Sequence, residues 1–382
     1  MNTVDPSLLI GPDTMPGLPA PYWFLLSFKV LGFILHAVPM NLWFAGIIVS
    51  MLLNRYGGPH SRRQAARLME QMPFIISAGV NLGIVPLLFM QVAYYKVFYP
   101  ATILMAWPWF LIIVLLAVAY YGVYLYALNL RGKAGWLAPI ASGAGWLSAL
   151  LFIVIGFIFS NAMSLMVNLS AWPKLWEATS VAGAPLGIGH NLSDPTLLPR
   201  FLMFFGLALM TLAVYMIFDA RILAGRESLE YRHAVPGLAM KTATVALAFY
   251  AGCGSWYFFS ALPEAARTYM TQDWHVVLTG VTAMAIGLPW LLIAVQLHRS
   301  SAAMAVLTAL AQVAAISANA VSRQIVQNRE LSQYLDVAAG KVNPQWDTLA
   351  IFLLLFVGGL VVLFWMVAKV VQVQRHPSHR KA

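Results

Sequence analysis

The chain has a single cysteine, Cys253, among its 382 residues. It therefore cannot form an internal disulfide, and it has no Cys-x-x-Cys-His stretch for covalent attachment of a c-type haem. A cysteine-ligated iron–sulfur cluster needs several thiolates and is excluded as well. Any redox cofactor of this chain must be held by histidine, methionine or carboxylate side chains, or must belong to a partner.

Charged residues are also scarce, at 9% of the chain against 61% hydrophobic residues. Soluble domains are about one quarter charged and about half apolar, so a soluble enzyme is excluded. The first twenty residues contain two aspartates and no lysine or arginine, and the sequence therefore predicts no cleavable signal peptide. The composition predicts an all-α, polytopic membrane protein that forms one integral membrane domain over residues 1–382.

Nine apolar segments are long enough to cross a bilayer as helices. Two connections, at about 171–197 and 323–347, are long, and we expect them to form a docking surface on the outer side. The nine predicted spans are about 21–53, 73–95, 103–130, 138–170, 198–220, 238–262, 276–297, 302–322 and 348–372.

The basic residues are unevenly divided between the two sides of the predicted bundle. Fifteen of the 23 lysines and arginines fall on the side opposite the amino terminus, together with only four of the 13 acidic residues. Because cytoplasmic loops carry the excess of lysine and arginine, we expect the amino terminus outside and the carboxyl terminus in the cytoplasm. The net charge of +10 is thus a topology signal and does not indicate nucleic-acid binding.

His36 is the only histidine well inside a predicted span. A neutral imidazole there can ligate haem iron through one nitrogen while a hydrogen bond orients the other. The alternative is a structural histidine bonded to a neighbouring helix. The remaining histidines lack the spacing of a metal site.

Lys29 lies seven residues before His36, which is two helical turns, so both residues share one helix face. A haem ligated by His36 with its propionates pointing outward could pair with Lys29. The alternative, which is the more common fate of such a lysine, is a side chain that snorkels to the outer interface.

Other polar residues in the spans are explained by hydrogen bonds between helices. Asp219 and Arg221 are predicted to form an interfacial ion pair. Because His36 is the only ionisable residue expected at mid-depth, a transporter or channel is a remote alternative. The polar residues assigned to interhelical hydrogen bonds are Asn81, Gln91, Asn161, Asn168, Gln312 and Asn319.

The order of several features resembles subunit I of cytochrome bd-type quinol oxidases, which also has nine spans. The shared features are His36 followed by Pro39 in the first span, GVNLGIVPLLFMQV at 79–92, NAMSLMVN at 161–168, DPTLLPRFLM at 194–203, and the Arg323–Gln324 step at the end of the eighth span. The resemblance implies an outer amino terminus, an inner carboxyl terminus and a second integral membrane subunit as partner.

The chain departs from that family at the residues that reduce oxygen. Met203 stands where the family has its second haem-ligating histidine, and Lys369 stands where it has a carboxylate ligand. Its two proton-feeding carboxylates correspond to Gln91 and Trp107, and only about 263–275 remains of its quinol-binding loop. The resemblance therefore implies a relative that does not reduce oxygen and that keeps one haem site at His36, or none. Met203 is a candidate second axial ligand, and the alternative is a methionine that only packs between helices.

The sequence thus predicts a subunit of a respiratory or photosynthetic electron-transfer complex in the bacterial inner membrane. It would pass electrons between the quinone pool and a periplasmic redox protein such as a c-type cytochrome, through one haem b or through a quinone site alone. Such a complex would be a quinol:cytochrome c-type oxidoreductase, in contact with lipid and other integral subunits. The alternative is a cofactor-free scaffold derived from an oxidase subunit.

Overall fold

The computed structural model describes residues 5–13 and 17–375, and nearly all of them are helical. Within these residues, nine helical segments are long and apolar enough to cross a membrane. This confirms the predicted all-α polytopic fold. The nine are α1 (Tyr22–Tyr56), α2 (Pro59–Ala93), α4 (Ala106–Leu130), α5 (Ala138–Val167), α7 (Leu197–Phe218), α8 (Leu229–Trp256), α10 with α11 (His275–Met284 and Gly287–Gln296), α12 (Ala302–Leu331) and α13 (Trp346–Arg375).

Short elements connect or extend these helices. The strands β1 and β2 pair antiparallel, with Ser180 opposite Pro185. The short elements are η1 (Pro6–Leu9), α3 (Tyr95–Leu104), η2 (Gly135–Leu137), η3 (Leu169–Ala171), α6 (Trp172–Ala178), β1 (Ser180–Val181), β2 (Ala184–Pro185), η4 (Asp219–Leu223), η5 (Tyr257–Ala261), α9 (Glu264–Met270) and η6 (Val337–Ala339).

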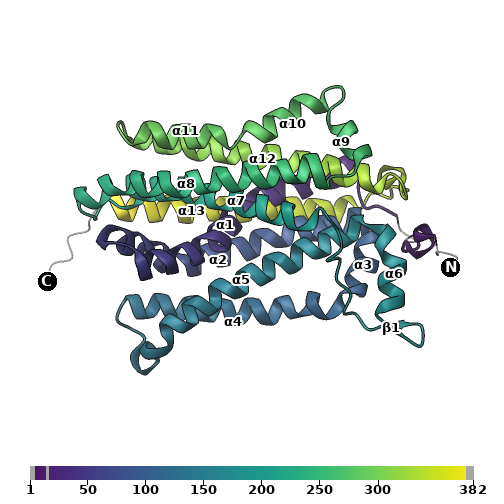
Figure 1. Cartoon of the computed structure of the whole chain (residues 1–382), viewed down its shortest axis with the longest axis horizontal. Coiled ribbons are helices and arrows are strands. Elements are labelled where there is room, and N and C mark those ends of the chain that lie inside the picture. Colours follow the sequence, from purple (N-terminus) through teal and green to yellow (C-terminus); the bar gives the residue numbers. More distant parts are fainter. Residues whose placement is uncertain (1–4, 14–16, 376–382) are drawn as a thin grey trace.

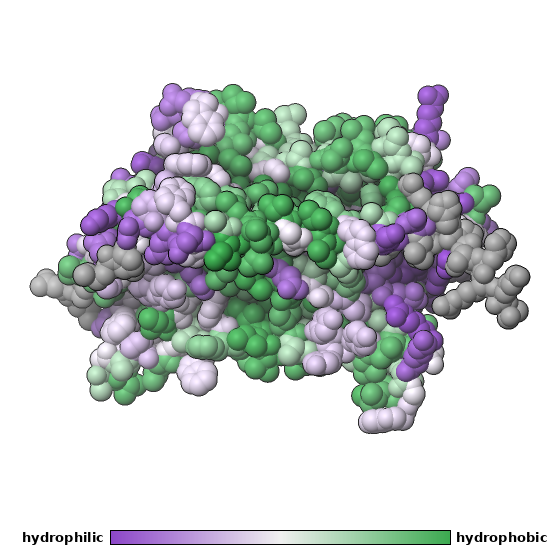
Figure 2. All heavy atoms as spheres, turned by 180° about the vertical axis from the view of Figure 1, so that it is seen from behind, coloured by the Kyte–Doolittle hydropathy of each residue, from purple (hydrophilic) through white to green (hydrophobic). Residues whose placement is uncertain are grey.

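The long helices run along a common axis as one bundle (Figure 1). The elements η1, α3, α6, α9 and the β1–β2 hairpin gather at one end, called here the amino-terminal end, and α13 finishes at the opposite end. That opposite end, where α1 ends and α2 begins, is called the basic end. Seen from behind, the middle of the bundle is mostly hydrophobic and the polar residues gather toward its two ends (Figure 2). This distribution matches a bilayer crossed along the long axis.

Glycines allow the central helices to approach closely. A Cβ built on Gly32 of α1 would lie 2.9 Å from Val85 Cγ1 and 3.1 Å from the backbone nitrogen of Pro86 in α2. A Cβ on Gly206 of α7 would lie 2.7 Å from the backbone nitrogen of Tyr250 in α8. Small residues at such crossings are the usual means by which membrane helices pack. α1 packs most extensively against α2, and it also contacts α5, α7 and α12.

Three helices are longer than the hydropathy pattern predicts. α2 begins at Pro59 instead of about residue 73, α8 begins at Leu229 instead of about 238, and α12 continues to Leu331 instead of about 322. The predicted outer connection at 323–347 is therefore wrong in its first part, since residues 323–331 are helical. All three extensions carry polar residues that find partners on other helices, which hydropathy does not detect. The predicted orientation across the membrane stays a prediction.

Candidate functional site

Lys29 is buried inside the bundle, with 5% of its surface exposed. Its Nζ donates to Gln324 Oε1 at 2.6 Å and to Gln327 Oε1 at 3.0 Å, both from α12. The same Nζ lies 4.3 Å from the centroid of the Tyr94 ring. Lys29 therefore does not snorkel to the interface, because two amide oxygens inside the bundle accept its hydrogen bonds.

Hydrogen bonds between uncharged side chains connect Gln324 to its neighbours. Gln324 Nε2 donates to Tyr94 Oη at 2.7 Å and to Asn328 Oδ1 at 3.0 Å. Tyr94 Oη donates in turn to Asn328 Oδ1 at 2.6 Å, and Tyr22 Oη lies 2.7 Å from Tyr94 Oη. The network joins α1, the end of α2 and α12, and it fixes the Gln324 side chain in position. We call Lys29, Tyr94, Gln324, Gln327 and Asn328 the Lys29 cluster.

A cavity of about 40 Å³ borders this cluster. Arg323 also lines it, with its guanidinium carbon 5.0 Å from the centroid of the Phe33 ring. Neither Lys29 nor Arg323 has a carboxylate within 4.0 Å in the part of the chain that the structure describes. Gln327 Nε2 is buried and has no hydrogen-bond partner among the residues that the structure describes. The cavity thus combines two cations with an unused amide donor, and it suits an oxygen acceptor or an anion.

His36 lies two turns further along α1 and faces α2. Its Nδ1 is 2.8 Å from the carbonyl oxygen of Gly79. The ring covers Gly83, where a Cβ would lie 2.8 Å from His36 Cε1, and it contacts Trp43 edge to face. A carbonyl oxygen can only accept, so Nδ1 carries the proton in the neutral ring and Nε2 keeps a free lone pair.

Met203 and His36 contact different helices. Met203 Sδ lies against Gly254 of α8, 3.3 Å from where a Cβ would stand, whereas His36 lies against α2. Two residues that replace the oxygen-chemistry carboxylates are exposed: Trp107 is 70% exposed, and Lys369 Nζ contacts Gln372 on the surface of α13. Trp107 and Lys369 therefore lie at the surface of the chain.

The connection between α5 and α7 is anchored to the bundle by buried amides. Asn161 Oδ1 accepts a hydrogen bond from the backbone of Asn191 at 3.0 Å, and Asn191 Nδ2 donates to Ser164 Oγ at 2.8 Å. Ser164 also donates to Asp194, whose Oδ1 accepts from the Thr196 backbone at 2.8 Å. This connection holds α6 and the β1–β2 hairpin in a defined arrangement at the amino-terminal end.

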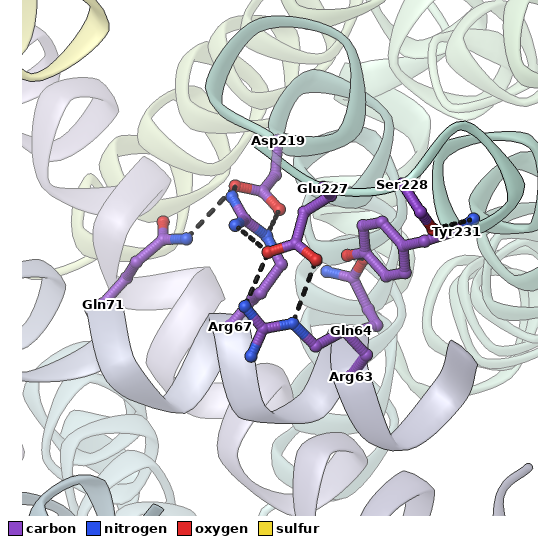
Figure 3. A network of polar contacts seen from close by, with 8 residues as sticks. All are labelled: Arg63, Gln64, Arg67, Gln71, Asp219, Glu227, Ser228 and Tyr231. Carbon is purple, nitrogen blue, oxygen red and sulfur yellow. Dashed lines mark hydrogen bonds and ion pairs between the residues drawn. The ribbon is translucent and has the colours of Figure 1, made fainter. Parts of the chain in front are cut away.

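A second polar cluster joins α2, η4 and the start of α8 at the basic end (Figure 3). Arg67 donates to both oxygens of Asp219, from Nε at 2.8 Å and from Nη2 at 2.7 Å. Glu227 accepts from Arg67 Nη1 at 2.9 Å and from Arg63 Nη2 at 2.6 Å. Gln71 Nε2 adds a bond to Asp219 at 3.1 Å. The charges of the two arginines and the two carboxylates cancel. This neutral cluster holds α2 against η4 and the start of α8, and we call it the clamp.

The predicted Asp219–Arg221 pair is wrong. Residues two positions apart do not face each other on a helix, and the π-helical turn η4 directs Asp219 toward α2. Sequence reasoning missed Arg67 as the partner because 152 residues separate the two. An aspartate at the end of an otherwise apolar span was the one signal that could have indicated a buried ion pair.

Acid is expected to weaken this clamp through Glu227, which lies in the connection between η4 and α8. The hydrogen bond from Arg63 holds the pKa of Glu227 below its ordinary value of 4.5, although partial burial opposes this. A carboxyl whose folded pKa is lowered stabilises the fold above its unfolded pKa and loses that contribution as the pH falls through the folded pKa. Thermal unfolding in detergent should therefore show a loss of stability below about pH 4.5 that Glu227→Gln reduces, whereas Glu264→Gln, at an exposed carboxylate of α9, should leave it unchanged.

No protein-family model matches the chain, and no curated protein matches it either. Among solved structures, a chain in "The structure of bd oxidase from Geobacillus thermodenitrificans" superimposes with a TM-score of 0.63 at 14% sequence identity. The match covers 98% of this chain and 99% of that chain. It confirms that the chain has a bd-oxidase-like fold over its whole length, as the resemblance of the sequence implies.

Proposed function

We propose that the chain is a subunit of a respiratory or photosynthetic electron-transfer complex in the bacterial inner membrane. It passes electrons between the quinone pool and a periplasmic redox protein such as a c-type cytochrome, and it does not reduce oxygen. The fold, which it shares with a bd oxidase chain, supports membership of such a complex. The residues that stand in place of the oxygen-chemistry ligands, Met203 and Lys369 among them, argue against oxygen reduction.

The observation that carries this proposal is the hydrogen bond of the His36 ring, which fixes its tautomer. Metal-ligating histidines usually donate their second N–H to a carbonyl or carboxylate, which fixes the tautomer and leaves the other nitrogen free to bind the metal. The bond from His36 Nδ1 to Gly79 meets this requirement, and Gly83 gives the ring space because it has no Cβ. The donor set therefore fits a haem b, which would supply one-electron transfer when bound. Met203, whose Sδ lies against Gly254 of α8, is proposed as a second residue that would hold the haem.

The Lys29 cluster supports a role next to such a cofactor. Lys29 and Arg323 supply two cations, and Gln327 Nε2 supplies an unused donor, all at one cavity on the amino-terminal side of His36. These groups would bind and orient the oxygen of a haem propionate or the carbonyl oxygen of a quinone. The neighbouring Tyr94 and Asn328 hold Gln324 in place and need not contact the ligand.

Partners are proposed for two surfaces. The anchored connection between α5 and α7 offers a docking surface for the periplasmic protein. Helix α13 exposes a long apolar surface, which suits lipid or a second integral subunit. Its most exposed large apolar side chains are Trp346, Ile351, Leu354, Leu355, Val361, Phe364 and Trp365.

A reduced-minus-oxidised absorption spectrum of the purified complex, with extraction and typing of non-covalent haem, tests the proposal. Wild type should show a b-type signal, and His36→Ala should lose it completely. His233→Ala, at an exposed histidine of α8, is the matched control and should keep the signal. Loss of signal in Met203→Leu would make Met203 the second ligand.

A wild-type complex that contains no non-covalent haem would remove the ligand assignment of His36. Extraction of quinone from the same preparation would then separate a quinone-only subunit from a cofactor-free scaffold. An equal haem content in wild type and His36→Ala would place the haem elsewhere in the complex.

A further inference from the structure

A second pocket lies at the basic end, between α1, α2 and α5, away from both polar clusters. It has a volume of about 370 Å³ and is lined by Met51, Asn54, Arg55, Arg62, Ser142 and Trp146. None of these residues is acidic. Neither arginine forms an ion pair with any residue that the structure describes, and the nearest ring to the Arg55 guanidinium carbon is that of Tyr56, at 5.3 Å. We call it the arginine pocket.

The donors of the arginine pocket suit a phosphate. Two guanidinium groups present forked N–H donors that match phosphate oxygens, and the Ser142 hydroxyl and the Trp146 indole add uncharged donors. Asn54 already donates to Tyr126 Oη at 2.7 Å, which holds its side chain in place at the wall of the pocket. Two formal positive charges with no carboxylate within 4.0 Å, in the part of the chain that the structure describes, favour binding of an anion.

The surroundings of the pocket indicate the source of that phosphate. Leu150 lies one helical turn deeper than Trp146 on α5 and is 58% exposed, and Leu52 lies close to one turn deeper than Arg55 on α1 and is 43% exposed. Polar donors toward the end of the bundle and exposed leucines toward its middle reproduce the order of a lipid headgroup and its acyl chains. Tryptophan at that boundary is typical of a membrane interface.

We infer that the arginine pocket binds the phosphodiester headgroup of an anionic phospholipid, with Arg55 and Arg62 as the recognising cations. Basic pockets between membrane helices are known to hold such headgroups. The site does not depend on any electron-transfer role of the chain, because it shares no residue with the Lys29 cluster or with His36. A lipid bound there would hold the ends of α1, α2 and α5 at the surface of one leaflet.

The test measures lipid retained by the full chain after exchange from mixed phosphatidylglycerol and phosphatidylcholine vesicles into detergent. Wild type should retain phosphatidylglycerol in preference to phosphatidylcholine. The double variant Arg55→Gln/Arg62→Gln should bind phosphatidylglycerol roughly 30-fold more weakly, about fivefold for each arginine near the surface. Lys133→Gln/Arg299→Gln removes the same charge from exposed residues at the same end and should retain lipid like wild type.

Three results would overturn the inference. The first is equal loss of phosphatidylglycerol in the pocket variant and in the control, since net charge alone would then explain retention. The second is equal retention of phosphatidylcholine by wild type. The third is binding of inorganic phosphate that requires both arginines while phosphatidylglycerol retention does not, which would assign the pocket to a free anion.

Discussion

Asp219→Asn is expected to lower the free energy of unfolding by about 3 to 5 kcal/mol, the cost of removing one partner from a buried ion pair. Asp219 is 1% exposed, and its carboxylate accepts both hydrogen bonds of the Arg67 fork and a third from Gln71. An amide keeps the shape but can offer only one acceptor oxygen to the two arginine donors. The guanidinium of Arg67 would then remain buried with Glu227 as its only carboxylate.

Thermal or denaturant unfolding of the detergent-solubilised chain measures this effect. The double variant Arg67→Met/Asp219→Leu separates the energy of the pair from the cost of leaving one charge alone. Apolar residues of similar volume often replace a buried ion pair without loss of stability, so the double variant should recover most of the stability that Asp219→Asn loses. A double variant that is less stable than Asp219→Asn would mean that the pair makes a net stabilising contribution.

The fold could be predicted from the sequence because each span carries its own signal. A run of about 20 apolar residues must satisfy its backbone internally as a helix when it crosses a bilayer, whatever the rest of the chain does. The nine spans were therefore found from local hydropathy, with most boundaries close to those of the structure. The order of weak motifs along the chain was sufficient to indicate the bd-oxidase-like fold.

The polar ends of the helices could not be predicted in the same way. Whether residues 323–331 form loop or helix depends on Gln324 and Gln327, and their partner Lys29 lies 295 and 298 residues away. The first half of α2 depends likewise on the pairing of Arg67 with Asp219. Such contacts connect different helices, and no local pattern along one helix contains them.

The candidate site was predicted in part. His36 was singled out from its depth in the first span, and its bond to Gly79 of α2 agrees both with an oriented haem ligand and with a structural histidine bonded to a neighbouring helix. Its role as a ligand stays a prediction. The position of Lys29 on the same face was found from helical spacing alone. Its glutamine partners, the cavity and the orphaned Gln327 amide were not, because they arise only where α1, α2 and α12 meet.

Lys29→Met is expected to weaken binding of the cofactor at the Lys29 cluster by at least about tenfold, since a hydrogen bond to a charged group contributes about 1.5 to 3 kcal/mol. The same substitution should have only a small net effect on the stability of the cofactor-free chain. Loss of the bonds to Gln324 and Gln327 leaves two acceptors unpaired, at a cost of about 1 to 3 kcal/mol each. Removal of a lysine from the bilayer interior returns about 2.5 to 3.5 kcal/mol, which offsets most of that cost.

The haem or quinone content per chain and the unfolding temperature of the cofactor-free protein are measured in parallel for this variant. Lys96→Met is the matched control, because Lys96 lies at the amino-terminal end, outside the cluster, and pairs with the exposed Asp13. If Lys29 had only a structural role, its substitution would lower the stability of the chain without a separate effect on cofactor binding. If Lys29→Met unfolds the cofactor-free chain but binds cofactor normally once folded, Lys29 holds α1 to α12 and has no role toward the ligand. The opposite result is weaker cofactor binding by a chain that is equally stable. It would mean that Lys29 is a buried cation that binds an anionic or carbonyl oxygen, at a position where an apolar side chain would pack as well.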